Sequence, residues 1–228
     1  MRTFQELNRL SVIIPTLNAA AEIPSALAML GGVGEAVVAD GGSRDDTVAI
    51  ARAAGARVVV AARGRGSQLA AGADAASGEW LLFLHADCRL AEGWREAVAS
   101  FMAAPGGAGQ AGYFEFALDD DAAAARRLER LVAWRCRVLA LPYGDQGLLI
   151  SRTVYDLIGG FRPLPLMEDV DLVRRLGRRR LAPLGVPLYA SARRYHRDGY
   201  LGRKLRNLLC LSLYFSGVPP RHIARLYG

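Results

Sequence analysis

Residues 35–47 read Glu-Ala-Val-Val-Ala-Asp-Gly-Gly-Ser-Arg-Asp-Asp-Thr. A short apolar run ends at Asp40, two glycines interrupt it, and a helical pattern follows over residues 45–54. A buried strand, a glycine break and a helix in that order are typical of a βα unit. The spacing Ser-x-x-Asp from Ser43 to Asp46 is a variant of the capping box, so we expect a helix whose N-terminal amides face the carboxyl edge of a sheet.

The same alternation extends in both directions from this stretch. Apolar runs predict strands at residues 10–15, 57–61, 80–84, 113–116, 148–151 and 183–189. Helical patterns cover residues 22–30, 67–76, 92–103, 122–141 and 170–179. Strands that alternate with helices in the first half predict an α/β fold, with a mostly parallel central sheet flanked by helices.

Charge limits the classes of partner. The chain has 228 residues, of which 52% are hydrophobic, enough to bury one core of ordinary size. Its formal net charge is +7, nearly all of the basic residues being arginine, with Lys204 the one lysine. On charge alone, nucleic acid, a phospholipid surface and a phosphorylated small molecule all fit. We expect no nucleic-acid partner, because the arginines are dispersed over several predicted helices and no RNA- or DNA-binding module is recognised.

Cysteine usage and hydropathy address localisation. Cys88, Cys136 and Cys210 are odd in number and widely spaced, which predicts neither a disulfide framework nor a zinc site and favours a reducing cytoplasm. Residues 1–9 lack the apolar core of a signal peptide, and no run reaches the about 18 apolar residues of a membrane span. Residues 208–218, which have basic flanks, suit either an amphipathic helix on a membrane surface or a helix docked on the core.

Polar residues follow the ends of the predicted strands. Asp40 ends the second strand and Asp87 lies just beyond the fourth, so both are expected at the crevice where parallel strands end. Each aspartate could equally cap a turn. The loop at residues 16–20 has no glycine, which argues against a dinucleotide-binding turn, and a P-loop is missing. Arg63 and Arg65 could bind phosphates there, the alternative being solvated surface arginines.

Four motifs occur in order along the chain. They are Pro15-Thr16-Leu17-Asn18, Val38-Ala39-Asp40-Gly41-Gly42-Ser43-Arg44-Asp45-Asp46-Thr47, His85-Ala86-Asp87 and Met167-Glu168-Asp169-Val170-Asp171-Leu172. In this combination the sequence resembles family-two glycosyltransferases with the GT-A fold, from about residue 10 to residue 181. The resemblance implies a single GT-A domain over residues 1–228. Its parts are a nucleotide-sugar-binding half at about 10–105, an acceptor-side half at about 106–190 and basic, apolar C-terminal helices at about 191–228.

The resemblance also implies roles for individual residues. The residues expected to bind the nucleotide are Pro15, Thr16, Asn18, Asp40, Arg65 and Ala86. Asp87 looks like the last aspartate of the DxD motif and so implies a metal ligand, while His85 stands where most members have aspartate. His85 could ligate the metal or be a buried structural histidine. The metal implied is Mg²⁺ or Mn²⁺, which a carboxylate binds and which neutralises a departing diphosphate.

Asp169 resembles the catalytic base of the ED motif, and Glu168 would orient it or the substrate. A base is needed because the acceptor hydroxyl must lose its proton as the sugar carbon becomes cationic. Alternatively, acidic residues simply enrich the first turn of a helix. Asp145 and Gln146 match a segment that walls the donor-sugar and acceptor pockets, although a glycine-rich turn capped by aspartate explains them as well.

The basic C-terminal segment has two functional interpretations. His196 and Arg197 could close over the diphosphate, or the segment could meet anionic lipid. A solvated helix face with an apolar stripe packed on the core is the structural alternative.

The sequence therefore predicts a glycosyltransferase that moves a sugar from a nucleotide-diphosphate donor to an acceptor hydroxyl. We expect inversion, metal assistance, a UDP-sugar donor and an unknown acceptor that is lipid-linked or hydrophobic. The expected place is the cytoplasm, with peripheral contact at the inner face of the membrane. The alternative is a non-catalytic sugar-nucleotide-binding or membrane-associated assembly module. A nucleotidyltransferase fits less well, because residues 16–20 lack a glycine-rich basic signature.

Overall fold

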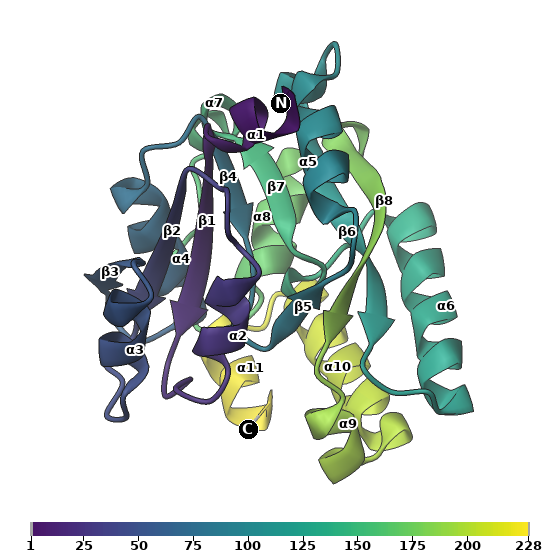
Figure 1. Ribbon diagram of the computed structural model, residues 1–228. Helices are drawn as coiled ribbons and strands as arrows, with labels where there is room; N and C mark the ends of the chain where they lie inside the picture. The colour runs from purple at the N-terminus through teal and green to yellow at the C-terminus, as the bar shows by residue number, and fades with distance from the viewer. Residues whose placement is uncertain (1, 228) are drawn as a thin grey trace.

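Four parallel strands form one half of the central sheet. They are β1 (Leu10–Thr16), β2 (Glu35–Asp40), β3 (Arg57–Val60) and β4 (Trp80–Phe83), in the spatial order β3-β2-β1-β4. The structure is a computed structural model that describes residues 2–227 (Figure 1). Met1 and Gly228, the ends of the predicted domain, lie outside the described residues.

Four further strands complete the sheet as a mixed half. They are β7 (Leu148–Ser151), β6 (Ala111–Leu118), β8 (Leu181–Ala190) and β5 (Cys88–Leu90), in that spatial order after β4. β7 is antiparallel to both β4 and β6, β8 is parallel to β6, and β5 is antiparallel to β8. The predicted α/β class with a mostly parallel sheet is confirmed.

Helices cover both faces of the sheet. One face packs against α2 (Ile23–Ala28), α3 (Thr47–Ala53), α5 (Trp94–Ala103) and α6 (Ala123–Leu139). The other packs against α4 (Arg65–Ala75), α7 (Arg152–Leu157) and α8 (Glu168–Leu176). α1 (Arg2–Leu7) lies against α5, and α9 (Arg193–Asp198), α10 (Tyr200–Phe215) and α11 (Pro220–Tyr227) follow β8. Short 3₁₀ turns occur at Gly107–Gly109, Gly144–Gln146 and Arg178–Arg180.

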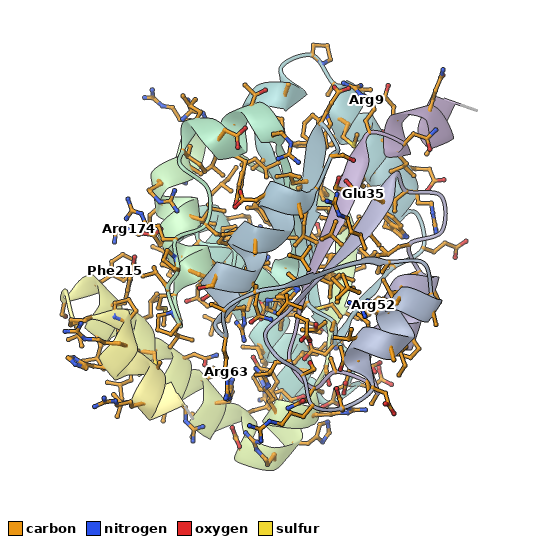
Figure 2. The ribbon with its side chains drawn as sticks, turned by 90° about the vertical axis from the view of Figure 1, so that its left-hand side faces the viewer. Arg9, Glu35, Arg52, Arg63, Arg174 and Phe215 are labelled. Carbon is orange, nitrogen blue, oxygen red and sulfur yellow. The ribbon has the colours of Figure 1, made fainter. Side chains whose placement is uncertain are left out.

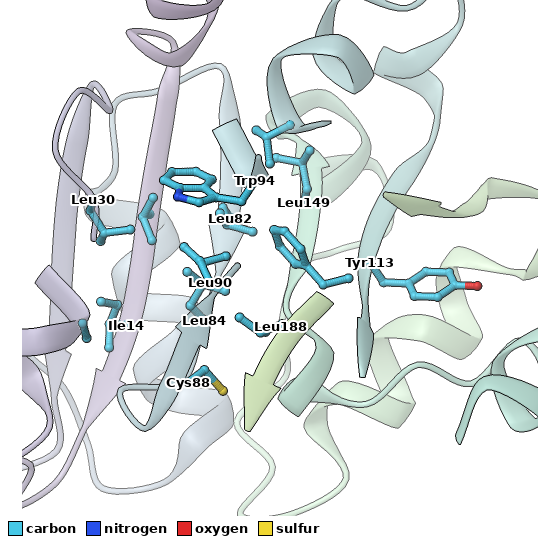
Figure 3. Close-up of a cluster of buried hydrophobic side chains, with 14 of the residues drawn as sticks. Ile14, Leu30, Leu82, Leu84, Cys88, Leu90, Trp94, Tyr113, Leu149 and Leu188 are labelled. Atoms are coloured by element: carbon cyan, nitrogen blue, oxygen red, sulfur yellow. The ribbon is translucent and has the colours of Figure 1, made fainter. Parts of the chain in front are cut away.

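The alternation of side chains along β1 shows how both faces are filled. Val12 and Ile14 belong to the cluster under α2, α5 and α6, part of which Figure 3 shows, whereas Ile13 belongs to the cluster under α4 and α8. All three side chains are buried. A parallel strand covered on both faces is apolar at most positions. Ser11, the one polar residue within 10–15, is buried, and its hydroxyl donates to Glu35 at 2.6 Å.

The strand directions bring several loops to one edge. β1, β2 and β4 all end there, and β7 begins there because Leu148 pairs with Phe83. β8 ends at the same edge, where Ala190 pairs with Cys88. In Figure 1 this is the lower edge, where α9, α10 and α11 also lie.

Four helix starts differ by two residues from the sequence-based expectation. The helices predicted from residues 92 and 170 begin at Trp94 and Glu168. The helix predicted from residue 45 begins at Thr47, and the predicted capping box is wrong, because Ser43 donates its hydroxyl to Asp40 instead. Asp45 accepts the Thr47 backbone amide at 3.1 Å in its place. The helix predicted from residue 67 begins at Arg65, so Arg65 lies on a helix rather than in a loop.

Three short elements were missed. They are α1, β5 and α7, with six, three and six residues. Elements of this length span less than two helical turns or two strand repeats, too few for periodicity to identify them. Within residues 2–227, no helix has the length and apolar character needed to cross a bilayer.

Gly72 lies where α4 packs closely against the sheet. A Cβ at this position would lie 2.4 Å from Ile13 Cγ2, a branched methyl in the buried centre of β1. We expect Gly72→Ala to lower the free energy of unfolding by about 1–3 kcal/mol, despite the better helix propensity of alanine. Urea denaturation measures this change.

Gly31→Ala is the matched control, because nothing lies within 4 Å of a Cβ at Gly31. Its stability should stay within about 0.5 kcal/mol of the wild type. Equal stability of the two variants would contradict the packing described for α4.

Candidate active site

Hydrogen bonds join the loop after β1 to the loop after β2. The Asn18 amide donates to Ser43 Oγ at 2.8 Å, and Asn18 Oδ1 accepts the Arg44 amide at 2.8 Å. Two more bonds run from the amides of residues 19–20 to side chains before and within the first turn of α3. Asn18 has a φ of 53°, a left-handed conformation that asparagine adopts more readily than most residues. The two loops therefore form one wall.

Asp40 is the buried centre of this wall. Its carboxylate accepts hydrogen bonds from the amides of Gly42 and Ser43 at 2.9 and 2.8 Å, and from the hydroxyls of Ser43 and Thr16 at 2.5 and 3.1 Å. Burial raises the pKa of Asp40, but the combined hydrogen bonds outweigh burial and hold the pKa below its usual range. Asp40 thus holds the two loops in this conformation. Its predicted contact with the base of a nucleotide stays a prediction.

Gln68, on α4, ties the loops to the strand ends. Its Nε2 donates to the carbonyl oxygens of Thr16 at 2.6 Å and Ala39 at 2.9 Å, and the side chain is buried. Gln68 is not among the site residues predicted from the sequence. A polar residue on an otherwise small and apolar helix face was the available signal.

The first cavity lies against this wall. Five of the six residues predicted to bind the nucleotide line it: Pro15, Thr16, Asn18, Arg65 and Ala86. Arg63, Gln68 and Arg194 also contribute to its lining. In Figure 2, Arg63 lies between the β-strand loops and the C-terminal helices.

A second cavity adjoins the first. Arg65, His85, Asp87 and Arg194 line both cavities, so the two meet at these residues. The second cavity is also lined by three more carboxylates, those of Asp145, Glu168 and Asp169. The structure therefore brings the predicted metal, catalytic and pocket residues together, apart from Gln146.

Asp169 is held at the start of α8 by backbone amides. Its Oδ2 accepts the Gly144 amide at 2.7 Å, and its Oδ1 accepts the Val170 amide at 2.7 Å. A carboxylate offers about four acceptor sites, so Asp169 keeps capacity to accept a proton. Gly144 needs to be glycine here, because a Cβ would lie 2.9 Å from His85 Nε2 and 3.4 Å from Asp169 Oδ2.

Glu168 is buried beside Asp169 and has limited compensation for its charge. Arg65 approaches its Oε1 at 3.6 Å, and its Oε2 is buried without a hydrogen-bond partner among the described residues. Burial, followed by the charge of Asp169, raises the pKa of Glu168 to about 7. Glu168 therefore exchanges its proton near neutral pH.

Asp171 and Arg175 hold α8 in place. Arg175 donates to Asp171 Oδ2 at 2.9 Å and 2.7 Å, and Arg162 donates to Asp171 Oδ1 at 3.1 Å. Arg175 also donates to the carbonyl oxygens of Ile158 and Gly160. Asp171 thus acts through the loop before α8 rather than through either cavity.

Asp145 and Gln146 separate in the structure. Asp145 lines the second cavity, its Oδ1 is buried without a hydrogen-bond partner among the described residues, and burial raises its pKa to about 6. Gln146 is buried outside the cavities, where Oε1 accepts from Arg135 at 3.0 Å and Nε2 donates to the Phe114 carbonyl at 3.1 Å. Arg135 stacks on Tyr143, 3.4 Å from the ring centroid, and so fixes the turn that carries Asp145.

His85, Asp87 and Cys88 form a candidate metal site. One ligand atom from each lies within 4.8 Å of the others. Burial, then Arg65, lowers the pKa of His85 to about 4, so its imidazole is neutral. Cys88 was not predicted as part of this site. It is the first residue of the short strand β5, directly after His85-Ala86-Asp87, and the sequence alone does not show to which side its thiol points. The Asp87 carboxylate suits Mg²⁺ or Mn²⁺, whereas a thiol and an imidazole favour softer metals.

The C-terminal residues differ from the expectation. Arg194 lines both cavities and Arg203 lines the second, and neither was singled out. His196 lies away from them, largely exposed, with Nε2 3.1 Å from Asp120 Oδ2. Arg197 is paired with Asp198 at 2.7 Å and lines a small neighbouring pocket with Arg65, Arg194 and Arg203.

Comparison with known proteins identifies a family. The model for glycosyl transferase family 2 matches residues 11–164. Glycosyltransferases of PGL/p-HBAD biosynthesis from Mycobacterium tuberculosis and Mycobacterium bovis are 41% identical over 93 residues. That alignment covers 36% of this chain and 36% of the length of each relative.

Solved structures match over most of the chain. Glucosyl-3-phosphoglycerate synthase from Mycobacterium tuberculosis, in complex with Mn²⁺, UDP-glucose and phosphoglyceric acid, has 26% identity and a TM-score of 0.60, covering 92% of this chain and 80% of that one. Another structure of that synthase has 26% identity and a TM-score of 0.62, covering 95% of this chain and 85% of that one.

The raised pKa of Glu168 predicts a pH-dependent stability. Because the folded protein holds this proton up to about pH 7 and the unfolded chain releases it near pH 4.5, stability falls as the pH rises through that window. Between pH 5 and pH 8, the wild type should lose about 2–3 kcal/mol relative to Glu168→Gln. Denaturation midpoints measured across this range test it.

Exposed Glu92 provides the control, and Glu92→Gln should leave the pH profile of the wild type unchanged. Parallel profiles for the wild type and Glu168→Gln would show that Glu168 is ionised throughout and that its burial costs little.

Proposed function

Because this chain belongs to glycosyl transferase family 2, we propose that it transfers a sugar from a UDP-sugar to an acceptor hydroxyl, with Asp169 as base and with inversion. The observation that carries this proposal is the junction of the two cavities. Arg65, His85, Asp87 and Arg194 line both, so a donor in the first cavity would present its diphosphate beside Asp169 in the second.

The nucleotide would occupy the first cavity. Thr16 and Asn18 supply polar groups, while Pro15 and Ala86 supply apolar surface for a base and ribose. UDP-glucose is present in complexes of the similar mycobacterial synthase, and this supports a UDP-sugar donor.

Positive charge around the junction suits a diphosphate. Arg65 and Arg194 line both cavities, and Arg63 lines the first. Arginine binds phosphate oxygens through charge-assisted hydrogen bonds, which strengthen as the leaving diphosphate gains charge. Arg65 also faces Glu168, so it would link the donor to the catalytic helix.

The donor set fits a divalent cation. Asp87 and His85 would hold it, and the buried, unpartnered Oδ1 of Asp145 shows that the cavity wall has acceptor capacity left for a cation or a ligand. A bound Mn²⁺ or Mg²⁺ would neutralise the diphosphate as it departs. Mn²⁺ in complexes of the similar synthase supports this choice.

The reaction then follows from the position of Asp169. Asp169 takes the proton of the acceptor hydroxyl, whose oxygen bonds to the anomeric carbon of the sugar. The bond between that carbon and the diphosphate oxygen breaks on the opposite face, and its electron pair leaves with UDP. Attack opposite the leaving group inverts the anomeric configuration.

The acceptor would enter beside Asp169. The second cavity, which Asp169 lines, is also lined by the apolar side chains of Leu166, Met167 and Val170. Such a lining favours an acceptor with an apolar portion, and this supports the expectation of a lipid-linked or hydrophobic acceptor. Membership of an enzyme family removes the reason to prefer a non-catalytic binding module.

Asp169→Asn tests the base. The amide oxygen can still accept the Gly144 amide, so the fold and UDP binding should persist while turnover falls by about two to four orders of magnitude. The measurement is UDP release from UDP-glucose with Mn²⁺, with water and a panel of alcohols, sugars and lipid alcohols as acceptors.

Asp121→Asn, at an exposed aspartate, is the matched control and should retain full turnover. Turnover of Asp169→Asn within threefold of the wild type would remove Asp169 from the mechanism. Proton NMR of the product's anomeric signal separately tests inversion.

A further inference from the structure

Helix α10 (Tyr200–Phe215) has an inward face that belongs to the active site. Arg203 is buried and lines the second cavity together with Asn207. Cys210 is buried in the cluster that joins α8, α10 and α11. These positions follow the helical spacing of three or four residues and define the side of α10 that packs on the protein.

The opposite face of α10 is apolar and exposed. Every exposed position on the helix is leucine, glycine, serine or phenylalanine: Leu201, Gly202, Leu205, Leu208, Leu209, Ser212 and Phe215. Four of these leucines are 53–68% exposed. Helical spacing places Leu201, Leu205, Leu208, Leu209 and Ser212 on one stripe of the helix. The solvent-facing stripe is therefore mainly leucine and contains no charged residue.

The other exposed apolar group does not share this composition. Leu131, Trp134 and Val138 are exposed on α6, but Arg127, Arg130 and Arg137 are exposed among them. A mixed surface of this kind is ordinary solvated protein surface. Of these two helices, only α10 has an exposed face without a charged residue.

Positive charge surrounds the apolar face. Residues 191–228 contain eight basic residues and one acidic residue, an excess equal to the net charge of +7 of the whole chain. The acidic residue is Asp198, which Arg197, Arg203 and Arg206 share at 2.7, 3.3 and 3.4 Å. Arg221 and Arg225 are exposed on the neighbouring α11.

We propose that the outer face of α10, with the basic residues beside it, binds the surface of an anionic lipid bilayer. An apolar helix face embeds at the boundary between headgroups and acyl chains, while flanking basic residues attract anionic headgroups. A second copy of the chain fits this face less well than a membrane does, because the positive charges of the two copies would repel each other.

This contact would place the active site at the membrane. The face that carries Arg203 and the face that carries Leu205 belong to the same helix, about 10 Å across. In Figure 1, α10 lies below the carboxyl ends of the strands. In Figure 2 the labelled Phe215, at the end of α10, lies beside Arg174 of α8, whose guanidinium carbon is 4.9 Å from the centre of the phenyl ring. The proposal holds whether or not the sugar-transfer assignment is correct, because the exposed leucines of α10 lie outside both cavities.

Vesicle co-sedimentation tests the proposal. The full chain is mixed with vesicles of phosphatidylcholine alone or with about one quarter phosphatidylglycerol, in low and high salt. Each basic residue near an anionic surface raises partitioning about fivefold, so binding to the anionic vesicles should exceed binding to neutral ones by at least tenfold and fall with salt.

Leu205→Gln/Leu209→Gln removes the apolar stripe without adding charge and without changing a cavity residue. Both side chains are more than half exposed, so the variant should fold, which its thermal melt checks. Its binding to anionic vesicles should fall at least tenfold. Leu157→Gln is the matched control, since Leu157 is 71% exposed on α7, and it should bind like the wild type.

Failure of the wild type to bind anionic vesicles would overturn the proposal. Equal binding by Leu205→Gln/Leu209→Gln would also overturn it, by showing that charge alone is responsible. Analytical ultracentrifugation completes the test: a wild-type dimer that the double variant makes monomeric would assign this face to a second copy of the chain.

Discussion

Four carboxylates beside one cavity impose the main electrostatic constraint on this molecule. Asp87, Asp145, Glu168 and Asp169 line the same space, and burial raises the pKa of both Asp145 and Glu168. Like charges in a desolvated cavity destabilise a fold unless cations compensate them. Arginines at the cavity supply part of that compensation, and a divalent cation would supply more. The positive charge of the protein is thus explained in part by its active site.

The surrounding structure holds these groups in position. The parallel strands bring the loops after β1, β2 and β4 to one edge, and the antiparallel β7 returns the turn containing Gly144 to it. The Gly144 amide then orients Asp169, and the contacts of Arg175 with Asp171 hold the helix on which Asp169 lies. Local backbone geometry and distant ion pairs together determine where the Asp169 carboxylate points.

Much of this arrangement follows from the sequence. Apolar runs identified most strands because strands buried on both faces leave no polar alternation, and strand-end residues such as Asp87 had to meet at one edge. Contacts between distant segments could not be read in the same way. Gln68 reaches two carbonyl oxygens across the sheet edge, and Gln146 is in the core although its neighbour Asp145 faces the cavity. Such orientations depend on the tertiary packing of a turn.

The proposed transfer reaction depends on a metal-dependent nucleotide site at the junction of the two cavities. Calorimetric titration with UDP, GDP and dTDP, each with and without Mn²⁺, tests it on the wild type and on Asp87→Ala. The account predicts that UDP binds the wild type in the presence of Mn²⁺, and that removal of either Mn²⁺ or the Asp87 carboxylate weakens binding at least tenfold. Absence of binding by all three nucleotides, or equal binding of UDP by Asp87→Ala, would contradict it.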